Sequence, residues 1–359
     1  MNRPNRLLAG LLAAQIIIAV LMFAPRLLPS STSRAPLLGA LQVTDIVGLT
    51  VQDKAGKSIG LENRSGTWVL PQSDDYPAES NKVRTFLEKL VGVQTDALVT
   101  RTASSHKRLQ VAADDYVRKI DLKLADGATR SLYLGSPSGA GATHVRLDGQ
   151  DEVYLARGLN SFEAGVEASA WINTTYLSVQ QSQVTSLKIT NAQGEFEFVK
   201  NAADQWVLKD LAADEQPNID QPTVLIARLG SVTMLKPLGK AAKPEYGFEQ
   251  PTAVVTVVVS DTASTKVKTL TIGSKDAEGN YPVISSDSPY YVSVSGFLLE
   301  QFVNANRASF LAQPTPTPTP ASTVTPPDLT ATPELTATAV VTETTPITST
   351  PVLTTTRAP

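Results

Sequence analysis

Alternation of apolar and polar side chains predicts that much of this chain forms β-strands joined by tight turns. The alternation is clearest over residues 187–199, which contain a turn at Gln193-Gly194. This is the pattern of a half-buried hairpin. Residues 46–61 carry a similar pattern around Ala55-Gly56. A third strand that contains tryptophan is predicted after each hairpin, at residues 68–70 and 206–208.

A helix is predicted after each tryptophan strand. In the later helix Asp220 is the predicted N-cap, Pro222 lies in the first turn, and Gly230 stands where a C-cap would. In the earlier one, apolar residues recur at the spacing of one helix face, which must pack on a sheet. That apolar stripe consists of Val83, Phe86, Leu87, Leu90 and Val91.

The remaining predicted elements are again mostly strands, followed by a short helical stretch in each part, at residues 161–168 and 297–305. An Asp126-Gly127 turn between two alternating runs is a strong hairpin signal. The order of strands, helix, strands and helix favours an α+β fold with antiparallel sheets. The strands are expected at residues 117–124, 131–134, 144–147, 153–155, 254–259, 268–272, 282–284 and 290–294.

These elements occur twice, at a fixed separation of 138 residues from Trp68 to Trp206. A constant offset across turns, helix and strands indicates that a whole structural unit is duplicated, because it far exceeds the periods of solenoid repeats. We therefore expect two tandem homologous modules, each with antiparallel sheet, one packed helix and a short closing helix. Residues that recur at this offset include Gly56, Asn63, Trp68, Thr85, Leu87, Gly92, Leu132 and Gly135, with counterparts Gly194, Asn201, Trp206, Thr223, Leu225, Gly230, Leu270 and Gly273.

The N-terminus carries an uncharged apolar run at residues 7–24, preceded by Arg3 and Arg6 and ended by Pro25. At about 1.5 Å per residue, a helix over this run spans most of a ~30 Å hydrocarbon core. The arginines favour a cytoplasmic N-terminus. We therefore expect an uncleaved signal-anchor, and a single-pass protein of the cell membrane with its C-terminal bulk extracytoplasmic. The alternatives are a cleaved signal peptide, whose apolar region is usually shorter, and a buried core helix.

The C-terminal residues 313–359 are rich in Thr, Pro and Ala and nearly lack charged and aromatic residues. Such a composition buries too little apolar surface to offset the entropy of ordering, so we expect a disordered tail. It is either a passive spacer or an O-glycosylated stalk. The expected organisation is a signal-anchor at residues 1–30, a linker at 31–42, modules at 43–178 and 179–312, and the tail at 313–359.

The composition of the chain limits the kinds of ligand and reaction that we expect. The 31 basic and 34 acidic residues nearly balance, and without a basic stripe we expect no nucleic-acid partner. The chain has no cysteine and only two histidines, His106 and His144. It lacks the familiar hydrolase, nucleotide and dinucleotide motifs, so we expect no catalytic residues, no cofactor and no metal. The acidic pairs Asp74-Asp75 and Asp114-Asp115 and the loop 276–280 are interpreted as turns or solvated surface, with calcium or sugar binding as the alternative.

The order of these features resembles the family called DUF4340, a domain of unknown function, over approximately residues 40–312. The segment 108–113 replaces the Tyr-Gly-Phe-x-x-Pro motif in the first copy. The resemblance implies proximity to ABC-transporter components of the gliding-motility type and assigns no catalytic residue. The predicted structural anchors of the repeat are Trp68, Trp206, Gly135, Gly273, Tyr246 and Gly247. The resemblance rests on the membrane helix, Trp68 and Leu70, Trp206 and Leu208, the segment 246–251, the Gly-Ser turns, Val153-Tyr154 and Tyr290-Tyr291-Val292.

We expect a non-enzymatic ectodomain that binds or positions a partner, with an ABC-transporter-type membrane complex as the partner that the resemblance implies. Two homologous halves normally leave a cleft between them, so the groove between the modules is the expected binding site. One alternative is a cell-surface protein attached to envelope polysaccharide through its Thr/Pro tail. A second is a hydrolase built on carboxylates alone, which a perturbed carboxylate pair in a pocket would favour.

Overall fold

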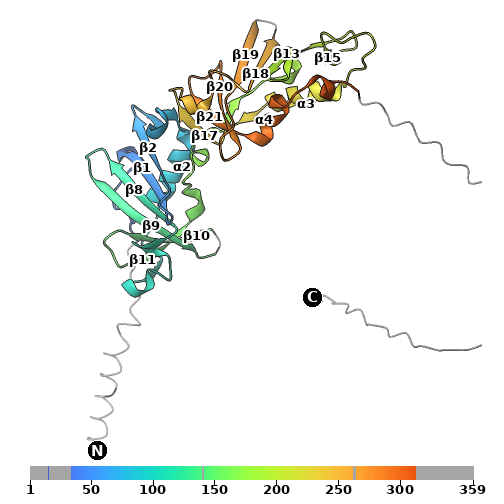
Figure 1. Ribbon diagram of the computed structural model, residues 1–359. Helices are drawn as coiled ribbons and strands as arrows, with labels where there is room; N and C mark the ends of the chain where they lie inside the picture. The colour runs from blue at the N-terminus through green and yellow to red at the C-terminus, as the bar shows by residue number, and fades with distance from the viewer. Residues whose placement is uncertain (1–14, 16–33, 140, 262–263, 313–359) are drawn as a thin grey trace, which may run out of the picture. The chain divides into compact units, whose positions relative to one another are not determined.

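The computed structural model describes Gln15 and residues 34–139, 141–261 and 264–312 (Figure 1). These residues form mostly antiparallel β-sheet with three α-helices, as the alternating pattern predicts. The helices are α2 (Ser80–Val91), α3 (Asp220–Leu229) and α4 (Gly296–Val303).

Within this described part of the chain, no helix has the length and apolar character needed to span a membrane. The signal-anchor expected at residues 7–24 lies outside the described residues, apart from Gln15. The Thr/Pro tail at 313–359 also lies outside them.

The first large sheet has nine strands in the order β4-β3-β2-β1-β8-β9-β10-β11-β5, and every pair in it is antiparallel (Figure 1). Helix α2 buries Val83, Phe86, Leu87 and Leu90, which confirms the predicted apolar stripe. The strands are β1 (Ile46–Asp53), β2 (Ser58–Arg64), β3 (Thr67–Leu70), β4 (Tyr76–Pro77), β5 (Leu98–Thr100), β8 (Arg118–Leu124), β9 (Thr129–Pro137), β10 (Ala142–Leu147) and β11 (Val153–Arg157).

The second large sheet has eight strands in the order β15-β14-β13-β18-β19-β20-β21-β17. Its strands are β13 (Val184–Asn191), β14 (Gly194–Lys200), β15 (Trp206–Leu208), β17 (Lys236–Gly239), β18 (Ala253–Ser260), β19 (Thr265–Ile272), β20 (Asn280–Ser285) and β21 (Tyr291–Ser295). Two small sheets pair β6 (Val111–Ala112) with β7 (Asp115–Tyr116), and β12 (Thr175–Leu177) with β16 (Val232–Thr233).

Equivalent strands pair in the same order in the two large sheets. In each sheet a short outer strand pairs with the last long strand, β5 with β11 and β17 with β21. The central hairpins also share one register, at the separation of 138 residues that relates Trp68 to Trp206. In the first sheet Val145 pairs with Leu134 and Tyr154, and in the second Val283 pairs with Ile272 and Val292.

The Gly-Ser pair of each sheet, inside β9 at Gly135-Ser136 and directly after β19 at Gly273-Ser274, lies against a backbone carbonyl from a preceding loop, so the first pair is part of a strand and not the predicted turn. The Ser136 peptide N–H donates to the Leu109 carbonyl at 3.0 Å, and the Ser274 N–H donates to the Tyr246 carbonyl at 2.8 Å. A Cβ at Gly135 would lie 2.1 Å from the Leu109 oxygen, and one at Gly273 would lie 2.0 Å from the Tyr246 oxygen. Only glycine leaves room for these hydrogen bonds.

The loop residue after each of these carbonyls has a left-handed backbone. Gly247 follows Tyr246 with φ +71°, and Gln110 follows Leu109 with φ +55°. Residues 108–113 lack the Tyr-Gly-Phe motif, but the Leu109 carbonyl makes the contact with Ser136 that the Tyr246 carbonyl makes with Ser274. Gln110 adopts a conformation that is costly for a residue with a side chain, and its neighbours hold it there.

Two local predictions are wrong. The closing helix expected at residues 161–168 is only a 3₁₀ turn, Ser161–Glu163, because the backbone leaves helical geometry at Ala164, where ψ is 71°. At α3 the cap is not Asp220, which is the first helical residue. The Asn218 side-chain oxygen accepts the Asp220 N–H at 3.2 Å instead, as N-cap side chains do.

Replacing Gly135 or Gly273 by alanine should lower the free energy of unfolding by about 1–3 kcal/mol, because the new methyl group overlaps a fixed carbonyl. Urea unfolding of the full chain in detergent, followed by tryptophan fluorescence, measures this. Gly60→Ala is the matched control, because its Cβ would meet nothing closer than 3.7 Å. Equal stability of all three variants would contradict the close approach.

Candidate functional site

The two repeated tryptophans lie in the protein interior. Trp68 is 5% exposed and Trp206 is 8% exposed. The Lys200 ammonium lies 5.6 Å from the centre of the Trp206 ring. Both rings are more than nine-tenths buried, so both serve packing.

The two histidines are buried and held by the backbone. His106 Nε2 lies 2.9 Å from the Asp151 carbonyl oxygen. His144 Nδ1 lies 2.8 Å from the Ser136 carbonyl oxygen and 3.2 Å from the Ser136 hydroxyl. A nitrogen that donates to a carbonyl cannot at the same time accept the hydroxyl proton, so His144 is not placed as a base for Ser136.

The acidic groups singled out in the sequence occupy turns and ion pairs. Asp114 pairs with Lys107 at 2.7 Å, and this hydrogen bond lowers the pKa of the Asp114 carboxyl. Asp115 pairs with Lys54 at 3.0 Å. Asp276 accepts the peptide N–H groups of its own turn. Across the described residues, no three acidic, histidine or cysteine side chains gather where they could hold a metal ion.

Asp74 and Asp75 have a role that the sequence did not indicate, because they lie where the two large sheets meet. Both adopt left-handed backbone, with φ of 53° and 60°. Asp74 Oδ2 accepts the Lys240 peptide N–H at 2.6 Å. A Cβ at Gly239 would lie 2.5 Å from that same oxygen. The Asp75 carboxylate pairs with Arg64. The Asp74-Asp75 turn is therefore an intersheet contact.

Three tyrosines pack beside this turn. The Tyr76 and Tyr290 rings meet edge to face, with centroids 4.8 Å apart. The Tyr290 hydroxyl donates to the Asp75 carbonyl at 3.0 Å, and the Tyr176 hydroxyl donates to the Tyr290 carbonyl at 2.7 Å. Burial, followed by the neighbouring Tyr176 and Tyr290, raises the pKa of Tyr76 to about 12. We call Asp74, Asp75, Tyr76, Tyr176 and Tyr290 the tyrosine junction.

A hollow of about 280 Å³ lies beside the tyrosine junction. It has an aromatic wall at Tyr76, while Glu79 and Asn173 bring polar groups. All of the residues that line this hollow belong to the first predicted module, residues 43–178, so it is not a groove shared by the two predicted modules. Its lining residues are Tyr76, Pro77, Ala78, Glu79, Asn173 and Thr175.

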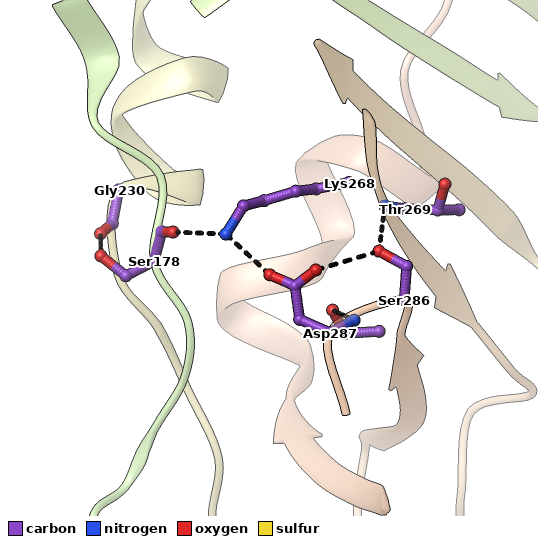
Figure 2. A network of polar contacts seen from close by, with 7 residues as sticks. Ser178, Gly230, Lys268, Thr269, Ser286 and Asp287 are labelled. Carbon is purple, nitrogen blue, oxygen red and sulfur yellow. Dashed lines mark hydrogen bonds and ion pairs between the residues drawn. The ribbon is translucent and has the colours of Figure 1, made fainter. Parts of the chain in front are cut away.

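A second, more polar hollow of about 450 Å³ lies on the second sheet. Figure 2 shows Lys268 reaching from β19 to Asp287, 2.7 Å away, and to the Ser178 carbonyl, 3.4 Å away. Ser286 links this pair to the sheet, because its hydroxyl donates to Asp287 at 3.3 Å and accepts the Thr269 N–H at 3.0 Å (Figure 2). The network fixes Asp287 against the end of β20.

Two sheets of related strand order that meet at a tyrosine-rich contact define an α+β protein built mainly of antiparallel sheet. Residues 68–241 match the model of the family described as Domain of unknown function (DUF4340). The resemblance to this family seen in the sequence is therefore confirmed over residues 68–241. The matched range begins at Trp68 in β3 and ends beyond β17, so it includes parts of both sheets. No curated protein and no solved structure matches the chain.

Asp74→Ala should lower the free energy of unfolding by about 1–2 kcal/mol, because it removes a charged acceptor and alanine tolerates left-handed backbone poorly. Asp114→Ala, which removes only a solvent-exposed ion pair, should destabilise the protein clearly less than Asp74→Ala. Chemical unfolding of the two full-length variants side by side measures the difference. Equal costs would show that the Asp74 contact contributes nothing beyond an ordinary surface charge.

Ionisation of Tyr76 should destabilise the protein at alkaline pH. The folded state holds this proton more tightly than the unfolded chain, since the pKa of Tyr76 rises from 10.0 to about 12. Its contribution to stability is complete below pH 10.0 and is lost as the pH rises through about 12. The stability of Tyr76→Phe should therefore fall less than that of the wild type across this range. An equal loss of unfolding free energy with rising pH in the wild type and in Tyr76→Phe would contradict a raised pKa for Tyr76.

Proposed function

We propose that this protein is a single-pass, membrane-anchored extracytoplasmic protein whose duplicated ectodomain binds or positions a partner without catalysing a reaction. The observation that carries the proposal is the pair of large sheets with related strand order, which meet at the tyrosine junction beside a hollow. A duplicated unit offers two related surfaces and a seam between them, which suits recognition.

The strand pairing supports the duplication of residues 43–178 as 179–312. The hairpins around Val145 and Val283 share one register. The Ser136 and Ser274 N–H groups, next to Gly135 and Gly273, also donate to a loop carbonyl in the same way. A shared glycine-dependent contact supports common descent of the two halves, because close backbone approaches are specific to a packing arrangement.

The partner we propose is a subunit of an ABC-transporter-type membrane complex, with the tyrosine junction and its hollow as the surface that it touches. The proposal of membrane attachment rests on the apolar run at residues 7–24 and its flanking arginines. The hollow combines an aromatic wall with the Glu79 carboxylate and the Asn173 amide. Aromatic rings beside a few polar groups are typical of protein-binding surfaces.

The Thr/Pro-rich composition of residues 313–359 favours a second candidate, a cell-surface protein attached to envelope polysaccharide through its tail. The two candidates differ in what removal of the tail does. Attachment to polysaccharide requires the tail, whereas membership of a membrane complex depends on the membrane segment and the ectodomain.

Site-directed photocrosslinking in intact native membranes tests the proposal. A photoreactive amino acid at Thr175, which is exposed in the hollow, should capture transporter subunits that mass spectrometry identifies. The same probe at Arg130, an exposed residue of β9 in the first sheet, is the matched control. Capture at Thr175 should persist when the chain ends at Gln313.

Two results would overturn the transporter proposal. Failure to capture any membrane protein at Thr175, with the protein present in the membrane fraction, would remove the partner. Release of the protein from the envelope on deletion of residues 314–359, with wall polymer bound by the intact chain, would favour attachment to polysaccharide.

A further inference from the structure

Strand β19 is only partly covered within the second sheet. Its neighbour β18 pairs with it along its whole length, from Ala253 opposite Ile272 to Ser260 opposite Thr265. On its other side, β20 pairs only with residues 270–272. The Ser286 peptide N–H extends this contact by one step, donating to the Thr269 carbonyl at 2.9 Å. Among the described residues, no strand lies beside residues 265–268 on that side.

The peptide groups of Thr265 and Val267 face this open side. In an antiparallel strand, alternate residues direct their N–H and C=O groups to the same neighbour. Thr269 bonds toward the β20 side through both its N–H and its C=O, so Val267 and Thr265 do the same. The Val267 side chain is 60% exposed. An uncovered row of peptide donors and acceptors is a template for one more strand.

The polar hollow lies along this open edge, and two lysines of β19 line it. Lys266 and Lys268 share a face of β19 that borders the hollow. Lys268 is paired with Asp287 at 2.7 Å, whereas no ion pair is recorded for Lys266 among the described residues. Asp261, at the far end of the hollow, accepts the Ser264 N–H in the hairpin turn. The edge therefore offers main-chain hydrogen bonds beside one exposed ammonium group.

We propose that the open edge of β19 at residues 265–268 binds an extended, acidic segment of a partner protein as an added antiparallel strand. The segment continues the line of β20 past Ser286, bonds to the peptide groups of Thr265 and Val267, and places a carboxylate against Lys266. This site is separate from the tyrosine junction and does not depend on the transporter proposal.

Charge argues against a second copy of this chain as the occupant. If two β19 edges paired about Val267, Lys266 of each copy would lie opposite Lys268 of the other. Like charges directly opposite one another destabilise a strand pair. Lysine on an edge strand is a known means of preventing self-association, and the same lysine favours an acidic segment.

Fluorescence anisotropy with the full-length protein in detergent tests the site. The probe is a short, blocked, labelled peptide of alternating threonine and valine with one central glutamate. The comparison peptides carry lysine in place of the glutamate, or N-methyl groups on alternate peptide nitrogens. We expect the glutamate peptide to bind most tightly, and N-methylation to reduce affinity by about tenfold or more because it blocks strand addition.

Two variants assign the binding to β19. Val267→Pro removes a peptide N–H that faces away from β18, so the sheet is kept while the outward donor is lost. It should weaken binding of the glutamate peptide by about tenfold. Lys266→Glu should reverse the preference between the glutamate and lysine peptides. Arg130→Glu changes an exposed cation on the first sheet and should leave the affinity unchanged.

Absence of saturable binding by the wild type would overturn the proposal, as would equal affinity for the glutamate and lysine peptides. Binding that survives both Val267→Pro and Lys266→Glu would place the peptide elsewhere. Concentration-dependent dimerisation of the protein, abolished by Val267→Pro, would show that the edge pairs with a second copy instead. Each result is independent of photocrosslinking at Thr175.

Discussion

The arrangement of this protein depends on how the peptide groups at the edges of its two large sheets are paired or shielded. An exposed row of such groups can pair with any strand that reaches it. The outer strand β17 of the second sheet carries Pro237, which lacks an N–H and suits an edge. The Ser73 hydroxyl donates to the Pro237 carbonyl at 3.4 Å, and Asp74 accepts the N–H of Lys240. The turn at the end of the first sheet thus covers the edge of the second.

The two candidate surfaces are the hollow beside the tyrosine junction and the open edge of β19. They differ because the edges of β17 and β19 are shielded to different extents. At β17, Ser73 and Asp74 bond to the edge, and the hollow beside the packed tyrosines is suited to recognition by shape and ring contact. At β19 the cover stops at Thr269, where Ser286 turns the chain toward Asp287. Recognition there depends on main-chain hydrogen bonds and on the charge of Lys266. The two surfaces therefore favour partners of different chemistry.

Much of the fold was predictable because short sequence patterns specify its helices, strands and turns. The stripe Val83, Phe86, Leu87 and Leu90 is the buried face of α2, and the Asp126-Gly127 turn joins β8 to β9. The closing helix predicted at residues 161–168 is absent, because the backbone leaves helical geometry at Ala164, which the apolar pattern does not indicate. Asp74-Asp75 has the composition of an ordinary turn, so nothing in its own sequence indicated a contact with Lys240, which lies 166 residues away.

The sequence by itself determined most of the long strands, the antiparallel fold class, the two main packed helices and the fixed separation of 138 residues between Trp68 and Trp206, because periodicity and turn chemistry are local. Only the tertiary structure decided which edges are covered. The carbonyl contacts at Gly135 and Gly273, the tyrosine junction and the uncovered length of β19 each join segments far apart in the chain. Their geometry depends on how whole sheets pack and end, which no local pattern encodes.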